Sequence, residues 1–343
     1  MDMRTLDDTA RSLLSGERGL LAMDESTPTC NRRFAALGIA QTAEMRRTYR
    51  DMIVTTPGLG ESIGGAILYD ETIRQRTNAG VPFAAALQQA GIVPGIKVDA
   101  GSKPLAGFPG EEVTDGLDGL RDRLVEYVGM GARFAKWRAV IRIGDGTPTD
   151  GGLLANAHAL ARYAALSQEA GLVPIVEPEV LMDGDHSLQR CRDVTAETLH
   201  IVFAQLHALR VRLEGMLLKP NMVLPGKDCA DQSDTATIAA ATVETLLRCV
   251  PAAVPGVAFL SGGQTARLAS ERLDAMNASY GARLPWALTF SFARAIQQPA
   301  MEAWRGDPAR VAVAQQALAH RAACNRAARR GRYDPARDAP AAA

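Results

Sequence analysis

Short apolar segments recur along the whole chain, each flanked by turn residues and separated from the next by a longer stretch of helical character. Continuous apolar strands that alternate with helices predict a parallel sheet covered by helices. Eight such strands are the number in a (β/α)8 TIM barrel, and an open doubly wound sheet is the competing α/β architecture. The segments lie at 20–23, 65–69, 93–96, 134–135, 173–176, 215–218, 257–260 and 286–290.

Several of the intervening stretches have the periodicity of amphipathic helices. Apolar residues recur at spacings of three and four over 153–170, 194–213 and 235–250, with a polar opposite face. No repeat, Ser-rich linker or break in composition divides the sequence. We therefore expect one barrel domain over residues 1–330, followed by a flexible Arg-, Pro- and Ala-rich tail over residues 331–343.

Polar residues stand at or just past the C-terminal end of nearly every apolar segment. In a barrel these ends converge on one mouth, where the active sites of this fold lie, whereas an open sheet spreads them along an edge. This pattern favours a single (β/α)8 barrel with its active site at the C-terminal mouth of the strands. The residues are Asp24, Lys97, Lys136, Glu177, Glu179, Lys219, Ser261 and Arg294.

Three lysines and three carboxylates in one mouth, without a plausible set of metal ligands, indicate amine chemistry. Lys219 is the best candidate nucleophile, because it follows an apolar segment and precedes Pro220, which cannot continue a strand ladder. A lysine that attacks a carbonyl must be neutral, and neighbouring cations favour the neutral form. Lys97 and Lys136 are expected to supply those positive surroundings.

The carboxylates are candidates for proton transfer. Glu177 and Glu179 stand two positions apart, and we expect one to face the barrel interior and the other its wall, with different roles. One would act as general acid and base during imine formation, while the other pairs with a cation. Asp24, at the end of the first strand, is the third candidate.

An anion site is predicted after the seventh and eighth strands. The sequence Ser261-Gly262-Gly263 can present backbone N–H groups to a phosphate, and Arg294 would supply a bidentate cation for the same anion. A nucleotide site is not expected, because Gly58-Leu59-Gly60 is followed by Ile63 where the dinucleotide fingerprint requires glycine.

Charge, cysteine content and the N-terminus exclude several classes of protein. The 38 Lys and Arg residues balance the 38 Asp and Glu residues, so no net field attracts nucleic acid or an anionic membrane. Five scattered cysteines without a CxxC pair argue against a disulfide framework and a thiolate zinc site. The acidic N-terminus and the absence of an apolar run of membrane length predict a cytoplasmic protein.

The sequence resembles the class I fructose-bisphosphate aldolases. The matching stretches keep the family's order over about residues 10–335, and the stretch that contains Lys219 is close to diagnostic. They lie at 22–27, 95–99, 134–138, 173–179, 213–221, 260–264 and 286–291. The resemblance implies reversible cleavage of fructose 1,6-bisphosphate to dihydroxyacetone phosphate and glyceraldehyde 3-phosphate, in glycolysis or gluconeogenesis.

The same resemblance implies an imine on Lys219, no metal or other cofactor, and a homotetramer. Two other functions stay open: another imine-forming sugar-phosphate lyase of the transaldolase type, and a barrel kept as a binding or scaffolding protein. The preference among fructose 1,6-bisphosphate, fructose 1-phosphate and sedoheptulose 1,7-bisphosphate also stays open.

A role for each site residue follows from the resemblance. Glu177 would handle protons as the carbinolamine forms and hydrolyses, Asp24 would take the C4 hydroxyl proton, and Lys136 would assist both steps. Glu179 would be an electrostatic partner of the lysines. The phosphate contacts would be Ser261, Gly262, Gly263, Ala293 and Arg294 at the C1 end and Ser26, Thr29, Arg33 and Lys97 at the C6 end, with Arg138 adding to the basic mouth.

Three departures from the family pattern stand out. Pro28 replaces a glycine found in many members and would stiffen the loop that holds Ser26. The pair Phe292-Ala293 replaces Tyr-Gly, although the Ala293 N–H is kept. The chain also lacks the terminal tyrosine that assists proton exchange in the animal and plant enzymes, and Tyr333 lies too early to replace it.

Overall fold

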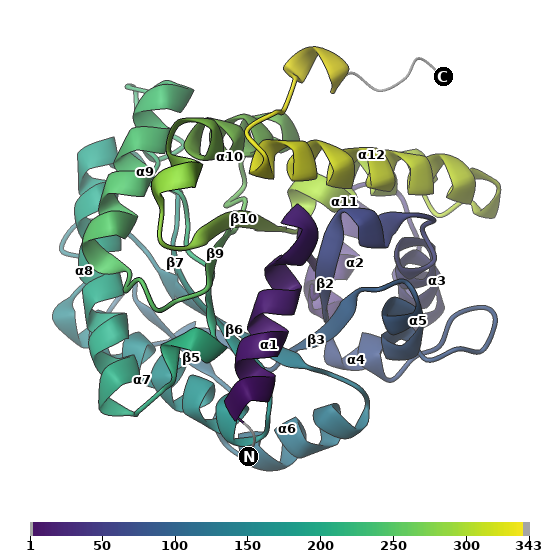
Figure 1. The fold of residues 1–343 in the computed structure, drawn as a ribbon, viewed down its shortest axis with the longest axis horizontal. Coiled ribbons are helices and arrows are strands. Elements are labelled where there is room, and N and C mark those ends of the chain that lie inside the picture. The colour runs from purple at the N-terminus through teal and green to yellow at the C-terminus, as the bar shows by residue number, and fades with distance from the viewer. Residues whose placement is uncertain (1–2, 339–343) are drawn as a thin grey trace.

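Eight parallel strands close into a barrel in the computed structural model, which describes residues 3–338 (Figure 1). The strands follow one another around the barrel in chain order, and the last pairs with the first. Each predicted apolar segment overlaps one strand. The prediction of a (β/α)8 barrel is therefore confirmed, and the alternative of an open doubly wound sheet is wrong. The strands are β1 (Gly19–Ala22), β2 (Ile63–Leu68), β3 (Val93–Lys97), β6 (Phe134–Ile141), β7 (Val173–Val180), β8 (Leu217–Leu218), β9 (Gly256–Phe259) and β10 (Ala287–Phe292).

Helices surround the barrel, and polar side chains cap several of them. Thr149, Ser187 and Thr265 each accept a hydrogen bond from a backbone N–H in the first turn of the following helix, as N-cap residues do. The three predicted helices are confirmed as α7 (Asp150–Glu169), α8 (Leu188–Ala208) and α9 (Thr235–Cys249), although α8 ends five residues early. The outer helices are α2 (Thr27–Ala35), α3 (Ala43–Val54), α4 (Asp70–Ile73), α5 (Phe83–Gln89), α6 (Leu120–Gly129), α7 (Asp150–Glu169), α8 (Leu188–Ala208), α9 (Thr235–Cys249), α10 (Ala266–Tyr280), α11 (Arg294–Trp304) and α12 (Val311–Arg329).

The first helix, α1 (Met3–Leu14), covers the N-terminal end of the barrel (Figure 1). Its apolar residues Leu6, Leu13 and Leu14 are buried in one cluster with the side chains that fill the barrel interior. The fit is close: a Cβ added at Gly256, the first residue of β9, would lie 2.6 Å from a methyl carbon of Leu14. The opposite, C-terminal end of the strands is therefore the end that is left for a site.

Two features of the chain are not predicted by the apolar pattern. A hairpin of β4 (Gly101–Pro104) and β5 (Glu112–Asp115) follows β3, and its first residues reach the C-terminal mouth of the barrel. Strands β6 and β7 are eight residues long, so Lys136 and Glu177 lie within strands rather than at their ends. Residues 339–343 of the predicted tail lie outside the described residues.

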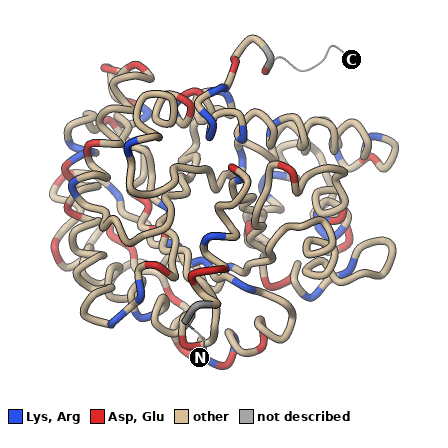
Figure 2. The backbone as a smooth tube through the Cα atoms, viewed as in Figure 1, with Lys and Arg blue, Asp and Glu red and all other residues tan. Residues whose placement is uncertain are grey.

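The surface agrees with the neutral composition. Lys and Arg residues alternate with Asp and Glu residues around the outer helices (Figure 2). Among residues 3–338, no helix has the length and hydrophobicity needed to cross a membrane. All five cysteines are free thiols.

Candidate active site

A cavity of about 520 Å³ opens at the C-terminal ends of the strands. It gathers residues from β1, β3, β6, β7 and β10 and from the segments that follow β1, β8, β9 and β10. The predicted site residues that line it are Asp24, Ser26, Thr29, Lys97, Lys136, Arg138, Glu177, Glu179, Lys219, Ser261, Gly262, Ala293 and Arg294. Arg33 and Gly263 line an adjoining cavity instead.

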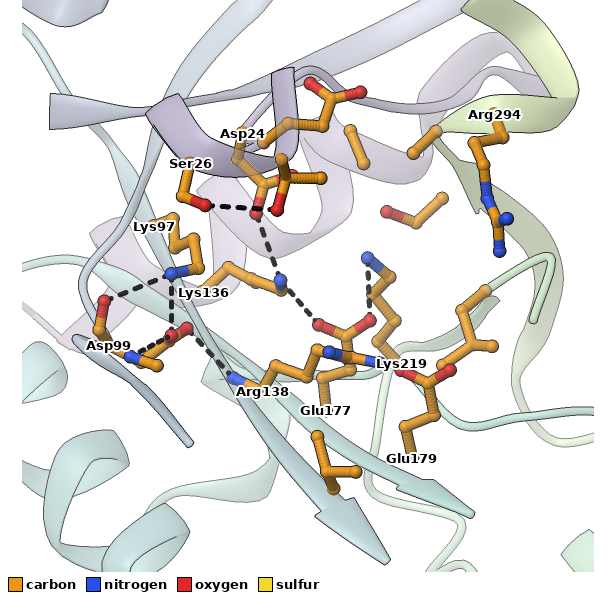
Figure 3. A pocket seen from close by; sticks show the side chains of 18 of the residues that line it. Asp24, Ser26, Lys97, Asp99, Lys136, Arg138, Glu177, Glu179, Lys219 and Arg294 are labelled. Carbon is orange, nitrogen blue, oxygen red and sulfur yellow. Dashed lines mark hydrogen bonds and ion pairs between the residues drawn. The ribbon is translucent and has the colours of Figure 1, made fainter. Parts of the chain in front are cut away.

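Four side chains at the bottom of the cavity form a line of alternating charge (Figure 3). Lys219 Nζ lies 2.9 Å from Glu177 Oε1, and Glu177 Oε2 lies 2.8 Å from Lys136 Nζ. Lys136 Nζ in turn donates a hydrogen bond of 3.0 Å to Asp24 Oδ2. All four residues are no more than 7% exposed, so little water screens these contacts.

The charges in this line stabilise one another. Burial by itself would raise the pKa of Asp24, but Lys136, Lys219 and Lys97 outweigh it and lower this pKa to about 2. The pKa of Glu177 is likewise lowered, because Lys136 and Lys219 outweigh burial. Burial would lower the pKa of Lys136, but Asp24 and Glu177 raise it above the ordinary value. Both carboxylates and Lys136 are therefore charged at neutral pH.

Glu179 does not take the position predicted for it. Residues two apart on a strand share a face, so the expected division between barrel interior and wall is wrong, and Glu177 and Glu179 both line the cavity. Pairing of Glu179 with the lysines is also wrong. The strand register sets Arg138 of β6 beside β7, and its Nε forms the ion pair with Glu179 Oε2.

Lys97 is held by Asp99, a residue that the sequence pattern did not single out for a role. Lys97 Nζ lies 2.7 Å from Asp99 Oδ1. The same carboxylate accepts hydrogen bonds from the backbone N–H groups of Gly101, at 3.1 Å, and of Arg138, at 3.2 Å. Asp99 thus fixes Lys97 to both the hairpin and β6. The only sequence signal for this role is its position two residues after Lys97.

The predicted C6-phosphate residues are divided between two places. Ser26 Oγ donates a hydrogen bond of 3.1 Å to Thr29 Oγ1 at the cavity wall. Pro28 stands in the first turn of α2 rather than in a loop, which is a position that proline tolerates well. Arg33 pairs with Glu25 and donates a 3.2 Å hydrogen bond to Gln298. Its guanidinium therefore lies outside the cavity that holds the lysines.

The segment after β9 has the geometry of an anion site. Gly262 and Gly263 have φ values of +58° and +87°, a left-handed conformation that favours glycine at both positions. A Cβ at Gly263 would lie 3.2 Å from Arg294 Nη2, which places the Arg294 guanidinium against this turn. Arg294 also begins α11, and the partial positive charge of a helix N-terminus attracts an anion.

The chain is similar to known proteins along nearly its whole length. The family model described as fructose-bisphosphate aldolase class-I matches residues 5–343. A relative from Xanthomonas campestris, named a probable fructose-bisphosphate aldolase class 1, is 51% identical over 97% of this chain and 99% of its own. Fructose-bisphosphate aldolase B from Gallus gallus is 47% identical over 96% of this chain and 91% of its own.

A solved structure shows the same fold. It is a fructose-bisphosphate aldolase from Plasmodium falciparum, determined in a ternary complex with TRAP and a small-molecule inhibitor. The two chains superpose with a TM-score of 0.94 and are 46% identical, over 96% of this chain and 95% of the other.

Proposed function

The chain belongs to the class I fructose-bisphosphate aldolase family, and from this premise we propose that Lys219 is the lysine that forms the Schiff base. The enzyme reversibly cleaves fructose 1,6-bisphosphate to dihydroxyacetone phosphate and glyceraldehyde 3-phosphate, a carbon–carbon lyase reaction of glycolysis and gluconeogenesis. The observation that carries the proposal is the 2.9 Å contact of Lys219 Nζ with Glu177 inside the cavity.

Imine formation follows from this contact. A proton that passes from Lys219 Nζ to Glu177 Oε1 leaves a neutral amine beside a carboxylic acid. The amine attacks the C2 carbonyl of the open-chain sugar, and Glu177 then protonates the C2 hydroxyl of the carbinolamine, which departs as water. The product is a protonated imine, whose nitrogen withdraws electrons from the neighbouring carbons.

Cleavage of the C3–C4 bond requires a base for the C4 hydroxyl, and Asp24 fits this role because it stays ionised. As Asp24 accepts that proton, C4 becomes the carbonyl of glyceraldehyde 3-phosphate. The electron pair of the broken bond flows into the iminium and gives an enamine on Lys219. Protonation at C3 and hydrolysis of the imine release dihydroxyacetone phosphate. Lys136 stabilises both carboxylates throughout.

The two phosphates are proposed to bind at opposite sides of the cavity. Ser261, Gly262, the Ala293 N–H and Arg294 take the C1 phosphate, supported by the left-handed turn and the start of α11. Ser26, Thr29 and Lys97 take the C6 phosphate. Arg33 contributes to this side indirectly, through its ion pair with Glu25, which itself lines the cavity.

No metal is proposed for the reaction. Each carboxylate that lines the cavity already faces a cation of the chain: Asp24 and Glu177 face Lys136, Glu179 faces Arg138, Asp99 faces Lys97, and Glu25 faces Arg33 and Arg50. The imine nitrogen supplies the electron sink that a metal ion would otherwise provide.

Borohydride reduction in the presence of dihydroxyacetone phosphate tests the assignment. The reduced adduct is expected on Lys219 in peptide maps, lost in Lys219→Arg and retained in Lys97→Arg. An adduct on another lysine would overturn the role of Lys219. Cleavage activity that is abolished by a chelator would overturn the metal-independent reaction.

Assembly and location are further parts of the proposal. A homotetramer is supported by the family resemblance, and light scattering would then give four times the 36.5 kDa mass of the chain. A cytoplasmic location is supported by five free thiols, which are typical of a reducing compartment. The binding to TRAP is a property of the Plasmodium relative, and no feature of this chain favours the transaldolase or scaffold alternatives over aldolase activity.

A further inference from the structure

Three potential metal ligands meet outside the catalytic cavity, at the C-terminal end of the described chain. His320 and Cys324 lie one turn apart on α12, and Asp338 follows a short 3-10 helix, Pro335–Arg337. The chain folds back over α10 and α12 here: the backbone N–H of the buried Tyr333 donates to Asp274 of α10 at 2.7 Å, and Asp338 pairs with Arg321 of α12. Sequence spacing gives no hint of this cluster, since Asp338 lies 14 residues after Cys324.

The three ligand atoms form a nearly regular triangle. Cys324 Sγ lies 3.6 Å from His320 Nε2 and 3.4 Å from Asp338 Oδ1, and His320 Nε2 lies 3.5 Å from Asp338 Oδ1. With zinc bond lengths of about 2.0–2.3 Å and tetrahedral angles, the corresponding edges are about 3.6 Å for S···N, about 3.5 Å for S···O and about 3.3 Å for N···O. The triangle therefore already has the dimensions of one face of a tetrahedral zinc site.

The surroundings supply the remaining parts of such a site. Tyr333 Oη donates a hydrogen bond to Asp338 Oδ2, the carboxylate oxygen that faces away from the triangle. Hydrogen bonds of this kind orient ligating carboxylates. A cavity of about 620 Å³, lined in part by His320 and Asp338, lies beside the cluster and leaves room for water as a fourth ligand.

Arg321 is the group that opposes a cation here, because its Nη1 contacts Asp338 Oδ1. A carboxylate oxygen has two lone pairs, so Oδ1 can face Arg321 and an ion at the same time. Arg321 is also held from its other side, since its Nη2 donates to Ala266 O at 2.9 Å and to Ser270 Oγ at 2.8 Å. The net charge of the thiolate, the carboxylate and this guanidinium is −1, which partly balances the charge of a divalent cation.

We propose that His320, Cys324 and Asp338 bind a zinc ion that ties the C-terminal segment to α12, apart from the catalytic cavity. A thiolate, an imidazole and a carboxylate are the donor types that zinc accepts together. On binding, the Cys324 thiol loses its proton to solvent as the sulfur–zinc bond forms. The ion has a structural role, so aldolase activity does not depend on it.

Cobalt is the probe for this site, because tetrahedral cobalt bound to a thiolate absorbs strongly in the visible and near-ultraviolet. The tag-free full chain, treated with a chelator and then with Co²⁺, is expected to show a sulfur-to-cobalt charge-transfer band at one ion per chain, and Zn²⁺ should bleach it. Cys324→Ser should lose the band, and Cys229→Ser, which alters the other partly exposed cysteine, should keep it.

Two further measurements separate a zinc site from a group of hydrogen bonds. Tyr333→Phe leaves all three ligands in place and is expected to weaken Co²⁺ binding by about tenfold through loss of the orienting hydrogen bond. Zn²⁺ should also slow proteolysis of the segment 331–338 in the unaltered chain but not in Cys324→Ser. Absence of the band, or an equal band in folded Cys324→Ser, overturns the proposal, and neither result bears on the Schiff base at Lys219.

Discussion

Lys219 Nζ and Glu177 Oε1 lie 2.9 Å apart, and the other oxygen of the same carboxylate faces Lys136. Glu177 is thus the only member of the charged line that contacts both the proposed nucleophile and the lysine that holds Asp24. In the proposed mechanism, its two oxygens therefore connect the lysine of imine formation with the lysine beside the base for carbon–carbon cleavage.

Replacing Glu177 should slow the enzyme much more than replacing its neighbour. Glu177→Gln is expected to lower kcat by about a hundredfold or more, because a general acid and base is lost. Glu179→Gln is the matched control on the same strand and the same cavity wall, and steady-state kinetics should show a far smaller effect on kcat. Equal losses in the two variants would contradict the assignment of proton transfer to Glu177.

Asp24→Asn should separate the two chemical steps. Cleavage of fructose 1,6-bisphosphate is expected to fall by about a hundredfold or more, since the C4 hydroxyl loses its base. The borohydride adduct with dihydroxyacetone phosphate should still form on Lys219, because that ligand has no C4. If trapping falls in parallel with cleavage, Asp24 instead serves imine formation.

The contribution of Asp24 to stability should disappear only in strong acid. Its folded pKa of about 2 lies below the ordinary value of 3.8, so the ionised group stabilises the fold above pH 4 and loses this effect as the pH falls toward 2. The shift corresponds to about 2 kcal/mol. The difference in unfolding free energy between the unaltered chain and Asp24→Asn should therefore be constant from pH 7 to pH 5 and shrink below pH 4 in urea titrations. A decline that begins above pH 5 would argue against this pKa.

Substrates with one and two phosphates should distinguish the two phosphate positions. Arg294→Ala is expected to raise KM by about tenfold or more for both fructose 1,6-bisphosphate and fructose 1-phosphate, because a charged hydrogen bond to the shared C1 phosphate is lost. Lys97→Ala should raise KM for the bisphosphate alone. The reverse pattern would show that the C1 phosphate binds near Lys97 and the C6 phosphate near Arg294.

Removing residues 333–343 should change stability rather than turnover. The deletion takes away the buried Tyr333 and leaves Arg321, which is 5% exposed, without Asp338. We expect Tm to fall by roughly 5 °C, consistent with loss of a buried charge partner, and kcat to change little. Deletion of 339–343 alone is the control that keeps both contacts. A hundredfold loss of kcat in the longer deletion would give the tail a catalytic role.

The barrel could be predicted because its strands are buried on both faces and therefore appear as continuous apolar segments. The residues that line the cavity could be singled out as candidates because charge is rare in such strands, and Lys136 and Glu177 interrupt β6 and β7. The hairpin of β4 and β5 could not be predicted, since its strands are short and polar and give no apolar signal.

Side-chain partners were the least predictable part. Arg138 pairs with Glu179 through the register between two strands, which spacing along the chain does not determine. Arg33 of α2 pairs with Glu25, which precedes this helix, so a cation expected at the substrate has its partner elsewhere. The ion-pair partner of a charged side chain depends on which opposite charge lies nearest to it after folding.

The helix α1 has a consequence for the order in which the sugar halves move. Its apolar side chains pack with those that fill the barrel interior, so within residues 3–338 they block the N-terminal end of the barrel as a route to the catalytic chamber. In the proposed mechanism, glyceraldehyde 3-phosphate then leaves through the opening by which the substrate arrived, while the three ketose carbons remain attached to Lys219. In the synthetic direction, dihydroxyacetone phosphate has to enter first, since an aldehyde bound ahead of it would obstruct the route to the lysine.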